Sequence, residues 1–260
     1  MNDYDFLEFA RTTVESTVSS LKENIRKRLK VEYKSKFDLF TEMDKYAENE
    51  ILKAIKKNFP EHDIVTEETD MERGGSDYVW YIDPISGSTN YAHGFPIYGV
   101  SLALKVGGKM KIGVIYNSIE DKVFYAERGK GAYLESEEIS VSDIENIEKS
   151  IVSTTFPYNE QGRKKNLEYF NNIAPKLEGI RRTGSVSVDF SYLSLGLLDG
   201  FWAVDLEPWD TSAGWLLVEE SGGKVSKLNG DDYGLEAESI LLSNGKIHED
   251  MIEVLKREDI

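Results

Sequence analysis

The sequence predicts a mixed α/β protein whose two halves differ in how helices and strands follow one another. In residues 1–145, two helical patterns come first and several short apolar strands follow, which is typical of an antiparallel sheet covered by helices. In residues 146–260, strands and helices alternate, which favours a mostly parallel sheet. We therefore predict an α+β N-terminal half joined to an α/β C-terminal half.

The N-terminal half is expected to begin with a long amphipathic helix over residues 3–30, because apolar residues recur there at three- and four-residue spacings. A second helix is expected at about 43–58. The pair Gly107-Gly108 tolerates positive φ and predicts a hairpin turn. The strands are expected at 63–66, 78–82, 97–106, 109–116, 123–126 and 132–134.

The boundary between the halves is expected near 140–150, after the acidic stretch at 135–149. Strand candidates beyond it are 151–154, 179–181, 200–204 and 239–243. The helices that alternate with them are expected near 161–177, 186–198, 209–221 and 246–257.

Composition narrows the partners of the chain. It has 31 basic and 47 acidic residues and a net charge of −16, so we expect neither nucleic acid nor membrane as a partner. An acidic surface also repels small phosphates unless cations are recruited, which makes a divalent metal a natural partner. The absence of cysteine excludes disulfides and cysteine-ligated zinc. The N-terminus is not of the signal-peptide type, so a cytoplasmic location is expected.

The most informative segment runs from Trp80 to Pro96. Asp83 ends an apolar strand, and Gly87-Ser88 can open a helix whose free N–H groups suit a metal-bound phosphate. An ordinary turn with Ser88 as a helix cap is the structural alternative.

Two further segments carry carboxylates at the ends of elements. Asp210 begins a helix, where it is either a cap worth about 1 kcal/mol or a cation ligand. Glu67 and Glu68 follow the strand at 63–66. They are either surface residues or, for one of them, a ligand of Mg²⁺, which prefers oxygen donors.

Together these segments resemble the inositol monophosphatase superfamily, which includes fructose-1,6-bisphosphatases and 3′-phosphoadenosine 5′-phosphate phosphatases; the archaeal type with dual activity is the most similar. The family motifs read TEE, WYIDPISGSTN and WDTSAG here, in the family order. The resemblance implies a layered α/β/α/β/α sandwich of the sugar phosphatase type. It also implies an active site between the two halves.

The resemblance further implies two or three magnesium ions. Glu67, Asp83 and the carbonyl of Ile85 would bind the first, and Asp83 and Asp210 the second. Glu67 would reach a third ion through water. Bound magnesium generates the nucleophile from water and stabilises the leaving oxygen.

The same resemblance assigns the catalytic residues as Glu67, Ser88 and Asp44. Ser88 and Asp44 would orient the attacking water. Backbone groups of Ile85, Gly87, Ser88 and Thr89 would hold the phosphate.

Two positions depart from the family pattern. Ser86 stands where the family has an aspartate ligand, which weakens the second metal site because a hydroxyl is a poorer ligand than a carboxylate. Ala203, seven residues before Asp210, replaces the glutamate of inositol-selective members, which favours broad or bisphosphate-tolerant hydrolysis. Gly184 and Ser185 resemble the sugar-contacting loop. Arg182 would meet a second phosphate or form a surface salt bridge.

We therefore expect a homodimeric, magnesium-dependent enzyme that hydrolyses a phosphate monoester of a sugar or polyol by metal-activated water. Inositol monophosphate and fructose-1,6-bisphosphate are the leading substrates. One alternative is a phosphatase of 3′-phosphoadenosine 5′-phosphate or NADP. Another is a catalytically impaired relative that binds phosphorylated ligands, which Ser86 supports.

Overall fold

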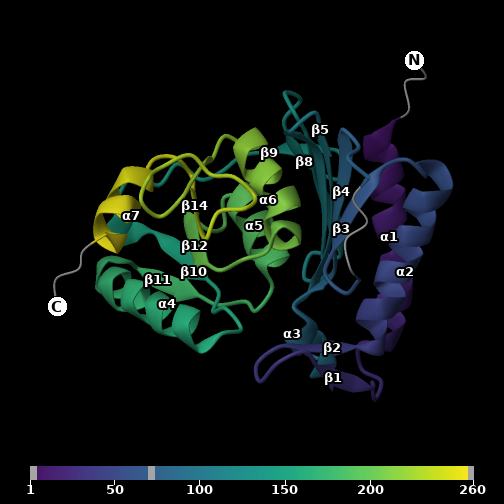
Figure 1. Cartoon of the computed structure of the whole chain (residues 1–260). Coiled ribbons are helices and arrows are strands. Elements are labelled where there is room, and N and C mark those ends of the chain that lie inside the picture. Colours follow the sequence, from purple (N-terminus) through teal and green to yellow (C-terminus); the bar gives the residue numbers. More distant parts are fainter. Residues whose placement is uncertain (1–4, 70–73, 257–260) are drawn as a thin grey trace.

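The computed structural model describes residues 5–69 and 74–256 and shows five layers in the order α/β/α/β/α (Figure 1). This is the layered sandwich that the sequence predicted. The central layer is made by two helices from the C-terminal half, and each outer layer by two further helices. From the N-terminal side the helices are α1 (Phe6–Asn24), α2 (Glu42–Asn58), α5 (Val186–Ser194), α6 (Pro208–Glu220), α4 (Glu160–Ile173) and α7 (His248–Leu255).

The first sheet has seven strands in the order β3-β4-β5-β6-β7-β8-β9. All its pairs are antiparallel except β3 with β4, which run parallel. The turn between β5 and β6 uses Gly107 and Gly108 at φ 55° and 83°, as predicted. The strands are β3 (Asp63–Thr66), β4 (Tyr78–Ser86), β5 (Gly99–Val106), β6 (Lys109–Asn117), β7 (Lys122–Glu127), β8 (Ala132–Leu134) and β9 (Glu137–Ile139).

The second sheet has five strands in the order β11-β10-β12-β14-β13. The prediction of a mostly parallel sheet holds for β10, β11 and β12, which pair in parallel, whereas β14 runs antiparallel to both of its neighbours, β12 and β13. No helix separates β13 from β14, so the chain returns beside itself in the opposite direction. The strands are β10 (Ile151–Thr154), β11 (Gly179–Arg181), β12 (Gly200–Val204), β13 (Lys224–Ser226) and β14 (Ser239–Ser243).

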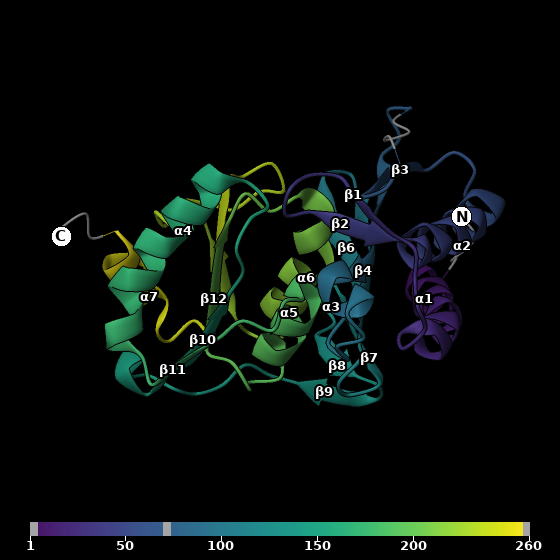
Figure 2. The same ribbon diagram turned by 90° about the horizontal axis from the view of Figure 1, so that it is seen from below.

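The first helix ends at Asn24 rather than at residue 30. Residues 3 and 4 of its predicted range lie outside the described residues, and so does residue 257 of the predicted C-terminal helix. Beyond the first helix, the sequence analysis missed a hairpin of β1 (Val31–Tyr33) and β2 (Leu39–Thr41). In Figure 2 this hairpin reaches from the N-terminal half toward the C-terminal half. Its tip therefore lies over the boundary between the halves.

Small residues bring α6 against both of its neighbours. A side chain at Gly214 would overlap the ring of Phe190 on α5. A Cβ atom at Gly113 on β6 would lie 2.6 Å from the carbonyl oxygen of Ala213. The run Ser212-Ala213-Gly214 thus permits backbone contact between helix and sheet.

Among the described helices, none combines the length and the apolar character that a membrane span requires.

Candidate active site

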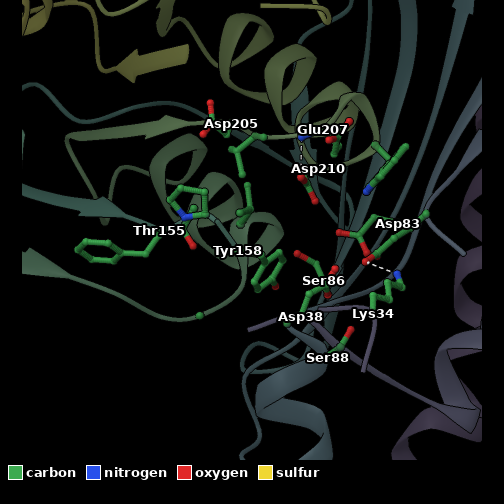
Figure 3. A pocket seen from close by; sticks show the side chains of 18 of the residues that line it. Lys34, Asp38, Asp83, Ser86, Ser88, Thr155, Tyr158, Asp205, Glu207 and Asp210 are labelled. Atoms are coloured by element: carbon green, nitrogen blue, oxygen red, sulfur yellow. Dashed lines mark hydrogen bonds and ion pairs between the residues drawn. The ribbon is translucent and has the colours of Figure 1, made fainter. Parts of the chain in front are cut away.

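A cavity of about 460 Å³ opens where the two halves meet. Glu67, Asp83, Ser86 and Ser88 line it from the N-terminal half. The C-terminal half contributes Tyr158, Gly184, Asp205, Glu207 and Asp210, among others. Figure 3 shows the labelled side chains around this space. The cavity therefore gathers carboxylates that are up to 172 residues apart in sequence (38 to 210).

Sheet register explains why Glu67 and Asp83 are neighbours. Thr66 is paired with Ile82 in the parallel β3–β4 ladder, so Glu67 and Asp83 follow at the same edge of the sheet. Asp83 is 2% exposed, and its Oδ1 atom has no hydrogen-bond partner among the described residues. A buried carboxylate oxygen without a donor indicates a missing cation or donor.

Glu48 on α2 fixes the turn that carries Glu67. Its Oε1 atom accepts hydrogen bonds from the Thr66 hydroxyl at 2.6 Å and the Glu68 N–H at 3.0 Å. Its Oε2 atom accepts one from the Thr69 hydroxyl at 2.6 Å. Sequence reasoning missed Glu48, because nothing in a helical Glu distinguishes it from a surface residue.

Asp210 has the capping role considered for it, and it also lies at the cavity. It lies in the first turn of α6, which Pro208 begins, and its Oδ2 atom accepts the Glu207 N–H at 2.9 Å. The residue also lines the cavity. The helix cap therefore orients the carboxylate.

The three carboxylates disfavour one another's charge. Burial raises the pKa of Glu67 to about 8, and the charges of Asp210 and Glu68 add to this. Burial likewise raises the pKa of Asp210 to about 7. Burial, followed by the charges of Glu67 and Asp210, raises the pKa of Asp83 well above its usual range. Such a cluster is stabilised by cations.

Lys34, at the tip of the β1–β2 hairpin, supplies one cation. Its Nζ atom lies 3.1 Å from Glu67 Oε1 and 2.6 Å from Glu68 Oε1. Burial would lower the pKa of Lys34, but these two carboxylates raise it. Among the described residues, no three Asp, Glu or His side chains already converge closely enough to hold a metal ion. Lys34 therefore reaches the site, where it pairs with Glu67 and Glu68.

Asp44 and Ser88 meet as the sequence predicted. The Ser88 hydroxyl lies 2.5 Å from Asp44 Oδ1 and 2.9 Å from the Ile85 carbonyl oxygen. The hydroxyl and N–H of Thr41 donate to Asp44 Oδ2 at 2.6 and 2.7 Å. Burial raises the pKa of Asp44, although these bonds lower it. Asp44 is thus held firmly as an acceptor for Ser88.

Gly87 and Gly184 allow loops from the two halves to touch. Both have positive φ, 100° and 86°, and a Cβ atom at Gly87 would lie 2.9 Å from the Gly184 carbonyl oxygen. Asn90, in α3 (Ser88–Ala92), donates to the Thr183 carbonyl at 2.9 Å and joins the same loop.

Three predicted contact residues do not line the cavity. Thr89 is exposed, and Ser185 is buried as the cap of α5, where its hydroxyl accepts the Val188 N–H at 3.4 Å. The Arg182 guanidinium lies over the Phe156 ring at 5.8 Å. Ile85, Gly87, Ser88 and Gly184 do line the cavity.

Ser86 turns toward the C-terminal half. Its Oγ atom accepts the Ser187 N–H at 3.2 Å, in the first turn of α5. The Ser86 hydroxyl also lowers the pKa of Asp83 somewhat, against the larger effect of burial. Ser86 therefore links the α5 backbone to the Asp83 carboxylate.

Comparisons with known proteins decide the family. The profile of the inositol monophosphatase family matches residues 3–259. The chain belongs to this family. It is 34% identical to the fructose-1,6-bisphosphatase/inositol-1-monophosphatase of Aquifex aeolicus, over 97% of this chain and 96% of that protein. It is 37% identical to the Nus factor SuhB of Pseudomonas aeruginosa, over 84% of this chain and 83% of that protein.

A solved structure of the family agrees with the fold. The extragenic suppressor protein suhB from Bartonella henselae superposes with a TM-score of 0.92 at 32% identity. The match covers 97% of this chain and 99% of that one. Because the inositol monophosphatase family consists of phosphatases, this chain is a phosphoric monoester hydrolase.

The sequence analysis missed several residues that line the cavity. Tyr158 lies beside the carboxylates: burial raises the pKa of its hydroxyl, and the charges of Asp210 and Glu67 raise it further. Asp38, Asp205 and Glu207 also line the cavity. These residues lie on loops and carry no motif, so a single sequence gives little signal for them.

Proposed function

We propose that this chain hydrolyses the phosphate monoester of a sugar or polyol with magnesium, and that Glu67, Asp83 and Asp210 hold the metal. The arrangement that supports this best is the Ser88–Asp44 pair beside the buried, unpartnered Asp83 carboxylate in one cavity. Inositol monophosphate and fructose-1,6-bisphosphate are the leading substrates, since the Aquifex relative is named for both.

The donors at the site fit a hard cation. They are carboxylate oxygens, whose burial and mutual repulsion raise their pKa values, together with the Ile85 carbonyl oxygen, and no sulfur-containing residue is among the described residues that line the cavity. Glu67, Asp83 and the Ile85 carbonyl would hold the first ion, and Asp83 and Asp210 a second. Bound magnesium supplies the acidity that lets water attack at neutral pH and the charge that stabilises the leaving oxygen.

Ser88 and Asp44 would position the attacking water. The Ser88 hydroxyl donates a hydrogen bond to Asp44 Oδ1, so the Ser88 oxygen can accept a hydrogen bond from the attacking water. Thr41 saturates the other oxygen of Asp44, which prevents the carboxylate from turning away. The N–H groups at Gly87 and Ser88, which line the cavity, would hold the phosphate.

The second ion should bind more weakly than the first. Ser86 offers a hydroxyl where the family has a carboxylate, and this hydroxyl already accepts the Ser187 N–H. We also propose that residues 1–145 and 146–260 act as the two walls of the site. A cytoplasmic homodimer is part of the same proposal, by analogy with the family.

Phosphate release tests the proposal. Inositol 1-phosphate, fructose-1,6-bisphosphate and 3′-phosphoadenosine 5′-phosphate are compared with Mg²⁺ and with a chelator. We expect release from at least one sugar or polyol ester that the chelator abolishes. Release that survives chelation, or release from the nucleotide alone, contradicts the proposal.

A further inference from the structure

Tyr158 has no part in the hydrolysis proposed above, although it is the only tyrosine among the described residues that line the cavity. It lies in the segment 155–159, which follows β10 on the C-terminal wall. Its side chain is 51% exposed. Within the described part of the chain, no residue makes a hydrogen bond to its hydroxyl. The hydroxyl is therefore available to a molecule in the cavity.

The residues on both sides of Tyr158 are held in place. The Nε atom of Arg163, on α4, donates to the Pro157 carbonyl at 2.8 Å. The side-chain amide of Asn159 donates to Asp205 Oδ2 at 3.0 Å, so the segment is also tied to the end of β12. The backbone at position 158 is thus fixed before a substrate arrives, and only the side-chain torsions of Tyr158 remain to be set.

Tyr158 lies at the Asp210 end of the cavity. The strongest charges that act on its hydroxyl are those of Asp210 and then Glu67, and Asp44 is not among the main ones. Figure 3 shows the ring directed from the C-terminal wall toward Ser86. The ordinary pKa of a tyrosine is about 10. Burial and these charges raise the pKa of Tyr158, so the hydroxyl carries its proton at neutral pH.

The geometry of phosphoryl transfer sets apart the two ends of the cavity. The attacking oxygen and the leaving oxygen lie roughly in line on opposite sides of phosphorus. With the phosphate held at Gly87, the Ser88–Asp44 pair places the water on one side. The alcohol oxygen then leaves on the opposite side, toward Asp210 and Tyr158.

We propose that the Tyr158 hydroxyl donates a hydrogen bond to the alcohol oxygen as this oxygen leaves phosphorus. The water oxygen forms a bond to phosphorus while the bond from phosphorus to the alcohol oxygen breaks, and the electron pair of the broken bond stays on the alcohol oxygen. A hydrogen bond strengthens as its acceptor gains charge, so this one stabilises the transition state more than the bound ester. Tyr158 keeps its own proton, and a proton released by the attacking water completes the alcohol by way of the solvent. This inference rests on the proposed function.

Tyr158→Phe tests the proposal, because it removes the hydroxyl and keeps the ring. With Mg²⁺ present, kcat/KM is measured for inositol 1-phosphate, phenyl phosphate and 4-nitrophenyl phosphate, whose leaving groups become less basic in that order. We expect a loss of about tenfold with the inositol ester, equivalent to about 1.4 kcal/mol, and of about threefold with phenyl phosphate. The loss with 4-nitrophenyl phosphate should stay below about twofold, because a weakly basic leaving oxygen gains little from a donor.

Tyr46→Phe is the control, since it removes a partly exposed tyrosine hydroxyl outside the cavity and should leave all three values unchanged. Equal losses with the two aryl esters overturn the inference, because these esters differ in the charge on the leaving oxygen and offer Tyr158 no alcohol hydroxyl to bind. A loss confined to the inositol ester overturns it too, by showing that Tyr158 binds another hydroxyl of the alcohol. An unchanged Tyr158→Phe enzyme does the same.

Failure of the proposed function is read from the native enzyme instead. If the native enzyme releases phosphate from none of the three esters, or releases it equally well in chelator, the proposed function fails and the inference falls with it. If the native enzyme is active with Mg²⁺ and the graded loss is absent from Tyr158→Phe, only the inference fails.

Discussion

The two walls of the cavity are built differently. On the N-terminal wall, Glu67 follows β3, Asp83 lies in the neighbouring β4 where the register with β5 shifts, and Asp44 is buried and fully hydrogen-bonded. On the C-terminal wall, Tyr158 and Asp205 lie on loops and are exposed. Glu67 and Asp83 are thus positioned by sheet register, whereas Tyr158 and Asp205 are carried by loops, which can change without disturbing the sheet.

Asp83→Asn tests the N-terminal wall most severely. We expect kcat/KM to fall about a thousandfold, equivalent to about 4 kcal/mol, because the residue is shared between the two metal positions. The metal-free protein should nevertheless unfold at a higher temperature. Burial and the charges of Glu67 and Asp210 raise the pKa of Asp83, so its ionised form destabilises the fold above the ordinary pKa.

Phosphate release and thermal unfolding in chelator measure the two effects. Asp232→Asn, at an exposed position outside the cavity, is the control and should change neither. If the metal-free variant unfolds at a lower temperature than the metal-free native protein, the Asp83 carboxylate stabilises the fold and the prediction is wrong.

Ser88→Ala tests whether the hydroxyl orients water. We expect kcat to fall about a hundredfold with little change in KM, because Asp44 then has no proton donor at Oδ1 and water has no acceptor at Ser88. Ser88→Thr keeps the hydroxyl and should retain most of the rate. A threonine variant as slow as the alanine variant would assign the loss to packing.

Ser86→Asp should strengthen the second metal position. A carboxylate there can accept the Ser187 N–H at the start of α5 and also face the cation. We expect a lower Mg²⁺ concentration for half-maximal rate and about a tenfold rise in turnover, about 1.4 kcal/mol. Ser86→Asn has a similar size without the charge and should give a smaller gain. Identical magnesium titrations for native and aspartate forms would remove Ser86 from metal binding.

His248, outside the cavity, and Glu67, which lines it, should make the stability of the fold depend on pH in opposite directions. His248 is buried between the Ser226 and Ser243 hydroxyls, 2.9 and 2.8 Å from its nitrogens, and burial lowers its pKa to about 4. Its folded pKa lies below the ordinary 6.5, so stability is lost as pH falls from about 6.5 toward about 4. Glu67, with a pKa raised from 4.5 to about 8, costs the metal-free protein stability as pH rises through that range.

Denaturant unfolding in chelator across pH 4–8 measures both slopes. Each unit of pKa difference between the folded and unfolded states changes the free energy of unfolding by about 1.4 kcal/mol. His248→Gln should flatten the acidic side of the curve, and Glu67→Gln the alkaline side. If the His248→Gln curve keeps the full acidic slope, other groups cause it.

The sequence was sufficient to predict the five layers and several residues that line the cavity. Ser88 and Asp210 lie in the first turns of helices, and Asp83 lies near the end of β4, which continues to Ser86; Pro84, Gly87 and Pro208 mark these places in the sequence. The β1–β2 hairpin was not predicted, since each strand has only three residues and β1 includes the charged Glu32. The pairing of Lys34 with two carboxylates follows only from the three-dimensional structure. The antiparallel β13–β14 pair was missed because β13 is short.

The contact between α6 and β6 limits how the cavity can open. The backbones of Gly113 and Ala213 lie so close that even one added methyl group does not fit. The two halves therefore cannot swing apart on a hinge without exposing the tightly packed centre of the molecule. Entry of substrate and departure of product must depend on movements of the surrounding loops, such as the β1–β2 hairpin, around a rigid frame.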